Sequence, residues 1–225
     1  MYRGKTISVV IPCYNEEEGL KGVIPSIPES VDEIVVVDNN STDTTAEVAR
    51  GLGARVVFEG RQGYGAAYKA GLPTVTGEIT VTMDGDGTYP VEQIEECIDY
   101  LLDNDLDFVS ACRFPLRDPQ AMNLSNKIGN SVLTIATLLL FMRAIKDSQS
   151  GMWIYRSAIY PRLAPKSDGM PLSEEIKIAA IRDPGITFGE YHVNYHPRIG
   201  EVKLQKWRDG MLNLLYLLKL RFTPQ

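Results

Sequence analysis

Apolar runs rich in β-branched residues alternate with amphipathic segments along the first half of the chain. The runs are typical of buried strands, and they occupy residues 6–12, 32–38, 54–60, 78–84 and 106–112. Apolar positions at helical spacing lie between them and predict helices over residues 18–27, 41–53, 61–71 and 90–104. Strands that are apolar throughout and alternate with helices favour a mainly parallel sheet covered on both faces. The pattern therefore predicts a three-layer α/β/α fold.

The second half of the chain is less regular. It predicts a helix over residues 171–183 and a strand over 187–197, with apolar segments at 129–146 and 207–222. The longest charge-free stretch, 128–142, overlaps the first apolar segment and is shorter than the roughly 20 residues of a membrane-spanning helix. We therefore expect it not to cross a bilayer. No linker or internal repeat interrupts the chain, which predicts a single domain.

The two apolar segments have cationic fringes, and Lys127 and Arg143 flank the first of them. A helix with an apolar body and a basic rim is typical of a membrane interface, where the cations meet anionic headgroups. The same pattern also fits core helices of an ordinary fold. The sequence is therefore compatible with peripheral contact with a membrane and with burial of both segments in the core.

Composition excludes some classes of protein. The 225 residues are 44% hydrophobic and 23% charged, as in an ordinary soluble domain. The net charge of −6 argues against a nucleic-acid partner, which a basic surface would attract. Cys13, Cys97 and Cys112 lack metal-type spacing and are odd in number, so we expect reduced thiols in the cytoplasm. We also expect no secretory signal at the N-terminus.

Polar residues follow three of the predicted strands. Asp84 and Asp86 come at the end of the strand over 78–84, Asp38 ends the strand over 32–38, and an acidic stretch follows the first strand. Ligands of parallel α/β sheets bind at the carboxyl ends of the strands. We therefore expect these side chains to converge on one site.

The Asp-Gly-Asp sequence offers two carboxylates to a hard cation. Mg²⁺ or Mn²⁺ typically takes one or two carboxylates together with substrate phosphates. A calcium loop would place Asp86 at position 3 and Glu95 at position 12, but it needs glycine where the chain has Tyr89. A solvated turn without a ligand is the other alternative. A dinucleotide fold is disfavoured, because the G-x-G sequence at 63–65 does not follow the first strand and has Tyr68 where the third small residue belongs.

With these pieces placed, the chain resembles the family 2 glycosyltransferases of GT-A fold, and among them the dolichol-phosphate mannosyltransferase-like branch. The likeness runs through "SVVIPCYNEE", "VVVDNNSTDTT", "RQGYGAAYKAG", "VTMDGDGTYP", "ACRF" and "DSQSGMWIYRS" to "YHPRIGEVKLQKWRDG". It implies a Rossmann-like fold in which residues 1–112 bind the nucleotide sugar. Residues 113–225 would form the acceptor side.

The resemblance also implies roles for individual residues. Asp84 and Asp86 correspond to the family's metal and diphosphate ligands, and Asp86, Arg113 and Asp147 are implied as catalytic. The donor site would also include Gly85, between the two aspartates. The remaining implied donor contacts are Pro12, Tyr14, Glu16, Asp38, Asn39, Arg61, Arg198 and Lys203. Two positions depart from the family, which often has a second aspartate at Asn39 and glutamine at Thr88.

The function implied is inverting, metal-dependent transfer of a hexose to dolichyl or undecaprenyl phosphate. The donor would be a nucleotide diphosphate sugar of the GDP-mannose or UDP-glucose type. We expect the protein on the cytoplasmic face of the membrane. A phosphate acceptor needs no general base, whereas a saccharide hydroxyl would need one, with Asp147, Glu174 and Glu175 as candidates. A silent nucleotide-sugar-binding protein of the same fold is the further alternative.

Overall fold

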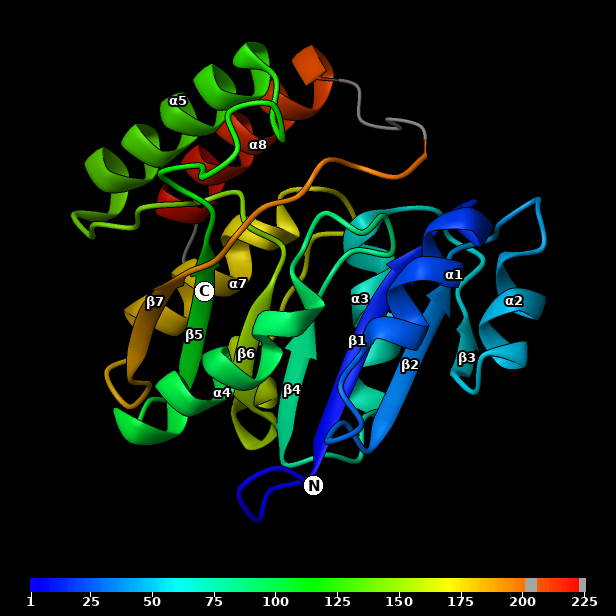
Figure 1. The fold of residues 1–225 in the computed structure, drawn as a ribbon. Coiled ribbons are helices and arrows are strands. Elements are labelled where there is room, and N and C mark those ends of the chain that lie inside the picture. The colour runs from blue at the N-terminus through cyan, green and yellow to red at the C-terminus, as the bar shows by residue number, and fades with distance from the viewer. Residues whose placement is uncertain (201–205, 223–225) are drawn as a thin grey trace.

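The structure is a computed structural model that describes residues 1–200 and 206–222. In these residues one seven-stranded sheet forms the centre, with the strand order β3-β2-β1-β4-β6-β5-β7 (Figure 1). The strands are β1 (Ile7–Cys13), β2 (Glu33–Asp38), β3 (Arg55–Phe58), β4 (Ile79–Thr82), β5 (Phe108–Cys112), β6 (Trp153–Arg156) and β7 (Phe188–His192). All pairs are parallel except those of β6, which is antiparallel to both β4 and β5.

Helices cover both faces of the sheet, as the alternating pattern predicts. They are α1 (Glu17–Ser26), α2 (Thr45–Gly51), α3 (Tyr64–Gly71), α4 (Ile94–Asp103), α5 (Leu124–Phe141), α6 (Tyr160–Leu163), α7 (Leu172–Arg182) and α8 (Lys206–Phe222). Short 3₁₀ turns cover Leu72–Thr74, Val91–Gln93 and Ser157–Ile159.

Two hydrophobic clusters hold the layers together. On one face, α1 and α4 pack on the sheet through side chains such as Leu20 and Ile98, both fully buried. On the other face, α3 and α7 pack through Tyr68 and Ile176, which are also fully buried. Burying apolar side chains on both faces fixes the positions of the strand ends. The predicted three-layer α/β/α fold is confirmed.

Some sequence-based boundaries were wrong. The helix predicted over 41–53 covers only Thr45–Gly51, because residues 41–44 form a turn in which the Asp43 side chain accepts hydrogen bonds from the backbone and hydroxyl of Thr45. The Thr44 hydroxyl donates a hydrogen bond to Glu17 on α1. Strand β6 was not predicted, because its four residues show no alternation that separates a strand from a loop.

Helices α5 and α8 lie side by side above the carboxyl edge of the parallel strands, outside the three layers (Figure 1). The side chain of Asn123 accepts a hydrogen bond from the backbone of Asn126 at 3.0 Å and so begins α5, which ends where Met142 adopts a left-handed conformation. Between the two helices a small cluster of Leu133, Ile178 and Leu217 forms, with Ile178 supplied by α7.

By length and composition α5 is apolar enough to cross a membrane, contrary to the expectation from residues 128–142 alone. The helix has 18 residues because it starts at Leu124, and its mean hydropathy is 1.2. Only 17% of its residues are buried inside the protein. Much of its apolar surface therefore has no partner among the described residues.

Candidate active site

The Asp-Gly-Asp turn lies at the end of β4, against the end of β1. A side chain at Gly85 would come 2.9 Å from the sulfur of Cys13, so only glycine fits between the two strands. On the outer side, a side chain at Gly19 would collide with the carbonyl of Gly85, so α1 approaches the turn closely. The turn is thus held by β1 and α1 before any ligand arrives.

Asp86 is held in one orientation by its neighbours. The side chain is 3% exposed and accepts hydrogen bonds from the Thr88 backbone at 3.0 Å and from the Thr88 hydroxyl at 2.6 Å. Thr88 therefore orients the aspartate, at a position where the family often has glutamine. The other carboxylate oxygen forms an ion pair with Arg198 at 3.0 Å.

Asp84 is in a different environment. No residue of the described chain donates a hydrogen bond to its carboxylate, and the enclosing protein, together with Asp86, raises its pKa to about 7. A nearby divalent cation would favour the ionised form of both aspartates. No group of three or more His, Cys, Asp or Glu side chains in the described residues is placed to hold a metal, so further ligands would come from phosphates and water. The pair fits Mg²⁺ or Mn²⁺.

Arg198 reaches this turn from the segment that follows β7. The backbone of that segment donates to the carbonyl of Asp86 from Ile199 at 2.8 Å and to the carbonyl of Thr88 from His196 at 2.9 Å. The guanidinium of Arg198 lies between Asp86 and Glu16, at 3.0 Å from each carboxylate. One predicted phosphate contact is therefore next to the predicted metal ligands. Lys203 lies outside the described residues.

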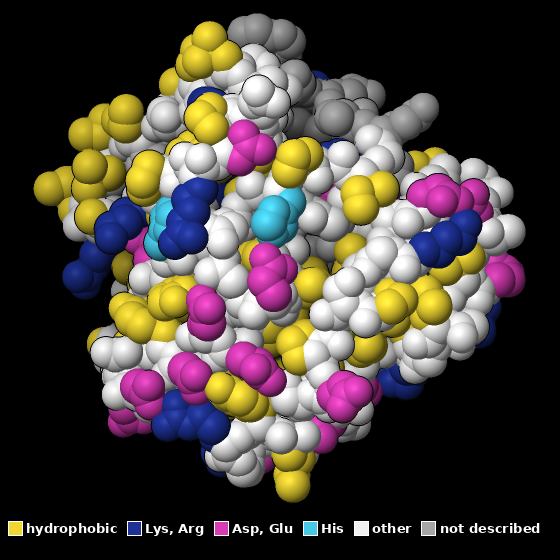
Figure 2. Space-filling model, in the orientation of Figure 1, with side chains coloured by type: hydrophobic (Ala, Val, Ile, Leu, Met, Phe, Trp, Pro, Cys, Tyr) yellow, Lys and Arg dark blue, Asp and Glu magenta, His cyan; other side chains and the backbone are white. Residues whose placement is uncertain are grey.

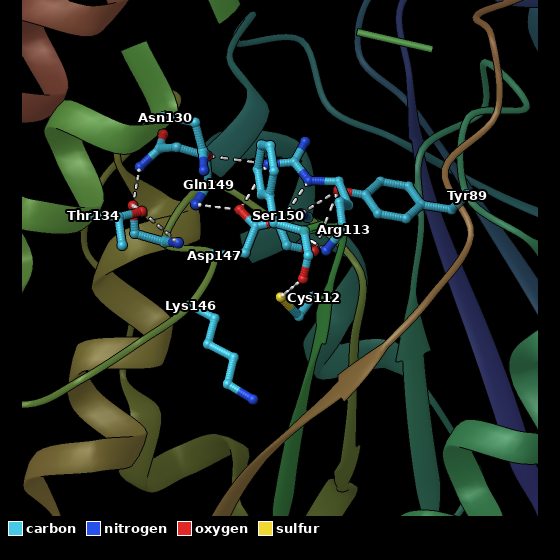
Figure 3. A network of polar contacts seen from close by, with 12 residues as sticks. Tyr89, Cys112, Arg113, Asn130, Thr134, Lys146, Asp147, Gln149 and Ser150 are labelled. Carbon is cyan, nitrogen blue, oxygen red and sulfur yellow. Dashed lines mark hydrogen bonds and ion pairs between the residues drawn. The ribbon is translucent and has the colours of Figure 1, made fainter. Parts of the chain in front are cut away.

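Arg113 and Asp147 form a buried bidentate ion pair, with distances of 2.7 and 2.9 Å (Figure 3). The carboxylate also accepts from the Arg113 backbone at 3.0 Å, and Asn130 of α5 accepts from the guanidinium at 3.2 Å. Burial disfavours a charged carboxylate, but the guanidinium outweighs it and lowers the pKa of Asp147. Asp147 thus positions Arg113, and a proton acceptor with a lowered pKa is a weak general base.

A cavity of about 290 Å³ brings the two groups together beneath α5 and α8. Its wall includes Asp84, Asp86, Arg113 and Arg198, and the amino-terminal parts of both helices close it from above. Glu174 and Glu175 do not line it, although both lie in the first turn of α7, as expected. The cavity therefore joins the Asp84 and Asp86 carboxylates to two guanidinium groups, with Asp209 of α8 also in its wall, and the aspartate pair with the guanidinium groups suits a divalent cation and phosphates.

The predicted nucleoside contacts lie at the ends of β1 and β2. Cys13 pairs with Asp38 in register, so Pro12, Tyr14 and Asp38 share one edge of the sheet. Asn39 is engaged within the chain: its side chain donates to the carbonyls of Glu59 and Arg61 and accepts from the Gly63 backbone at 2.7 Å.

Arg61 lies in an exposed ion pair with Asp168 at 3.0 Å, and it does not line the cavity. Its predicted contact with a donor phosphate would require this ion pair to open.

A buried lysine beneath the site was missed by the sequence analysis. Lys177 on α7 is fully buried and donates to the carbonyls of Ser150 at 2.7 Å and Asp147 at 3.3 Å. Burial lowers the pKa of Lys177 to about 7, and burial raises that of the neighbouring Glu174 to about 8. The sequence signal for a buried lysine is its place within the apolar stretch "IKIAAI". This signal is ambiguous, because a surface helix with a salt-bridged lysine shows the same pattern. Lys177 fixes both ends of the 147–150 turn.

Helices α5 and α8 present a broad exposed apolar surface above this cavity. We call it the α5/α8 surface; it consists of Leu124, Ile128, Val132, Ile135, Leu138 and Leu139 of α5, Met142 directly after it, and Met211, Leu212, Leu215, Leu218 and Phe222 of α8. Figure 2 shows hydrophobic side chains gathered over α5. An exposed apolar area of this kind marks an interaction surface.

Comparison with known proteins identifies the class. Residues 8–163 match the model of the glycosyl transferase family 2. This match covers more than half of the chain, and the fold and site agree with it. The chain belongs to glycosyltransferase family 2 and is a glycosyltransferase of GT-A fold.

Among curated proteins, the chain is similar to a dolichyl-phosphate hexose transferase of Haloferax volcanii. The two are 32% identical over 213 residues, covering 93% of this chain and 91% of the relative. A low-salt glycan biosynthesis hexosyltransferase of the same organism is 29% identical over 95% of this chain. The chain spans only 53% of that relative's length.

Among solved structures, the fold is similar to glucosyl-3-phosphoglycerate synthase from Mycobacterium tuberculosis, in a complex with Mn²⁺, UDP-glucose and phosphoglyceric acid. The TM-score is 0.77 at 24% identity, covering 99% of this chain and 81% of the other. At this identity the likeness supports the fold alone. Another structure of the same synthase contains Mg²⁺ and UDP.

Proposed function

We propose that the chain is an inverting, metal-dependent hexosyltransferase that uses a nucleotide diphosphate sugar and a polyprenyl phosphate. The observation that carries the proposal is the single cavity that joins Asp84 and Asp86 to Arg113 and Arg198 directly beneath the α5/α8 surface. A soluble donor and a lipid-borne acceptor would need such a site, polar inside and close to an apolar face. The similarity to a dolichyl-phosphate hexose transferase supports the same acceptor class.

The aspartate pair would bind Mg²⁺ or Mn²⁺ together with the donor diphosphate. When bound, the ion offsets the negative charge that develops on the departing nucleoside diphosphate. Thr88 keeps Asp86 oriented for this contact, and Gly85 keeps the turn close to β1. Because Asp84 has a pKa of about 7, protons compete for it, and metal affinity should rise with pH up to about 7.

The acceptor phosphate would be held by Arg113, whose guanidinium is fixed by Asp147. One acceptor phosphate oxygen attacks the anomeric carbon of the hexose from the side opposite the diphosphate. The bond from that carbon to the diphosphate oxygen breaks, and the bonding electrons leave with the diphosphate. The attacking oxygen is already ionised at neutral pH, so no base is required, which agrees with the commitment of Asp147 to Arg113.

Arg198 lies where it can serve the donor. It contacts Asp86 and Glu16 at 3.0 Å each, so a small rotation brings its guanidinium to a diphosphate bound at Asp86. A guanidinium suits this task because it offers paired donors to phosphate oxygens. The residue would thereby couple the occupied metal site to the segment after β7.

The α5/α8 surface would lie on the cytoplasmic face of the membrane, with the polyprenyl chain remaining in the lipid. Lys127 in the first turn of α5 and Arg143, two residues after its end, would face anionic headgroups. Peripheral contact of this kind leaves the donor side in water. It also places the cavity within reach of a phosphate at the membrane surface.

The test uses purified full-length chain with Mn²⁺, radiolabelled UDP-glucose, GDP-mannose or UDP-N-acetylglucosamine, and undecaprenyl or dolichyl phosphate. The proposal expects label to enter the organic phase with one donor. Label that appears only in water-soluble saccharide would indicate a hydroxyl acceptor instead. Binding of donor without release of diphosphate, for any acceptor, would show a silent binding protein.

A further inference from the structure

A second cavity of about 500 Å³ lies between α6, α7 and the carboxyl-terminal half of α8. None of its lining residues lines the cavity that contains the aspartate pair. Its floor is apolar, with Leu163 and Leu220 buried, whereas Arg162, Lys166 and Lys219 at its rim are exposed. A cavity of this volume, with a few polar groups around an apolar floor, has the form of a small-ligand site.

The charge of this cavity is positive, although the chain as a whole carries −6. Four cationic side chains line it, against the two carboxylates of Glu175 and Asp183. Glu175 is already satisfied, since it accepts from the Lys166 and Ser167 backbones at 3.0 and 2.8 Å and from the Tyr216 hydroxyl at 2.9 Å.

Asp183 is likewise used, because it pairs with Arg162 and accepts from the Gly185 backbone at 2.9 Å. Three cations remain: Lys166, Arg182 and Lys219. No carboxylate of the described residues lies within 4.0 Å of their charged groups. Arg182 lies over the Phe141 ring at 6.0 Å, and Lys219 over the Tyr216 ring at 5.7 Å, which leaves their donors open to an anion.

The cavity opens at the border of the α5/α8 surface. Lys219 follows Leu218, which is 39% exposed, and precedes the exposed Phe222 by less than one turn. On the α5 side, Arg182 contacts Phe141 at the end of the helix. A cation on a flexible stem beside an apolar face reaches the headgroup layer when that face lies on a membrane.

We propose that this cavity binds the phosphate group of an anionic membrane lipid, at a site separate from the catalytic one. The lipid chemistry rests on the proposed membrane contact, whereas the recognition of phosphate follows from the three unpaired cations. Arg182 and Lys219 would supply the donors, and the apolar floor would accept the adjacent part of the lipid. A soluble phosphate compound would use the same chemistry.

The test measures partitioning of the full chain onto phosphatidylcholine vesicles with and without phosphatidylglycerol. In Arg182→Gln/Lys219→Gln we expect the gain from phosphatidylglycerol to fall by about tenfold or more. The matched control is Lys21→Gln/Arg50→Gln, which removes the same charge from α1 and α2, at the far end of the sheet (Figure 1). The control should partition like the unaltered protein.

A second variant separates the cavity from general surface charge. Ala179→Leu fills the cavity and keeps every cation, so it should reproduce the loss if the cavity binds the headgroup. Thermal unfolding of each variant confirms folding. If Ala179→Leu and the control both behave like the unaltered protein while the double variant loses affinity, the charges act without a site and the proposal fails.

Titration with inorganic phosphate distinguishes the source of the ligand. Phosphate binding that the cavity variants lose, together with unchanged vesicle partitioning, would support the anion site and overturn the lipid assignment. Equal behaviour of all variants in both assays would overturn the site. Because partitioning needs no turnover, these failures are distinct from a failure of the proposed transferase activity.

Discussion

Helices α4 and α5 differ in how far their apolar residues are buried. On α4, Ile94 and Ile98 are completely buried against the sheet and the acidic residues face outward. On α5, Ile135 is 56% exposed and Leu139 is 69% exposed, while α8 covers only part of the helix. Helix α4 therefore belongs to the hydrophobic core. Helix α5 exposes an apolar surface that is suited to contact with an apolar partner.

The contrast extends to the two halves of the chain. The first half holds its polar site residues rigidly with strand ends and close glycine contacts, as at Gly85. The second half supplies Arg113 and Asp147, but spreads its apolar surface outward. Under the proposed function, the donor would reach the first half from water and the acceptor would reach the second half from the membrane. Donor chemistry and membrane attachment should therefore be separable by mutation.

The largest expected effect is in the first half. Asp86→Ala should lower turnover by at least about a thousandfold, because the negative charge on the leaving group then lacks its main counter-charge. Metal-dependent nucleotide binding, followed by calorimetry with Mn²⁺, should be lost with it. The control is Asp99→Ala, which removes a surface acid paired with Arg3. Unchanged turnover in Asp86→Ala would exclude the metal role, and loss of vesicle binding would contradict the separation of the halves.

The next effect concerns the junction between the halves. Arg113→Lys replaces a bidentate guanidinium with a single ammonium, and Asp147 then no longer fixes it in one orientation. We expect kcat/KM for the acceptor phosphate to fall by up to about 100-fold, with donor binding unchanged. Arg156→Lys, at a surface ion pair with Asp105, is the matched control. An equal loss in donor affinity would show that Arg113 contacts the donor rather than the acceptor.

A smaller effect is expected from the α5/α8 surface. Ile135→Glu places a charge on the face proposed to meet lipid, and should weaken partitioning onto vesicles by about tenfold or more. Activity with a short-chain, water-soluble acceptor should change little. Phe58→Glu provides the control, because Phe58 is 65% exposed but lies on β3, away from α5. Equal effects of the two variants would show that the α5/α8 surface has no special role.

The smallest effect is a pH dependence of stability beneath the site. Glu174 has a pKa of about 8 when folded, against 4.5 when unfolded, so the native state holds the extra proton between these values. Its contribution is complete below about pH 4.5 and is lost as the pH rises through about 8.

Glu174→Gln should therefore flatten the fall in the free energy of unfolding across this range. Relative to the unaltered protein, the variant should gain on the order of 1 kcal/mol, or about 2–4 °C in Tm, between pH 5 and pH 8. Denaturant titration at both pH values provides the measurement, and Glu47→Gln, an exposed acid on α2, is the control. A slope unchanged in Glu174→Gln would show that the carboxyl is ionised throughout. Lys177 has the opposite dependence, with stability rising from about pH 7 to 10.5.

Much of the first half could be predicted from sequence, because apolar strands alternating with helices leave few arrangements. The position of Asp84 and Asp86 followed from the rule that such sheets bind ligands at their carboxyl ends. Local pattern carries this information, since each strand is contiguous and its end is marked by polar residues.

The rest depended on contacts between distant segments. The residues around Arg198 do not indicate by themselves that this segment lies against the turn at Asp86. The contact depends on backbone hydrogen bonds to residues more than 100 positions away. Lys177 could not be recognised as buried, since its partners are carbonyls of another segment. The composition of α5 did not decide whether its apolar residues lie on the surface or in the core. Only the arrangement of α8 and α7 decides it.

The reversed direction of β6 has a consequence for where the segment between β5 and β6 lies. Its neighbours deliver their last residues to the ligand edge, whereas β6 delivers the residues that precede it, including the turn that contains Asp147. The long excursion between β5 and β6, with α5 inside it, therefore starts and finishes at the same rim. Under the proposed function, an exchange of this excursion would alter the acceptor side of the cavity and leave the ends of β1, β2 and β4 in place.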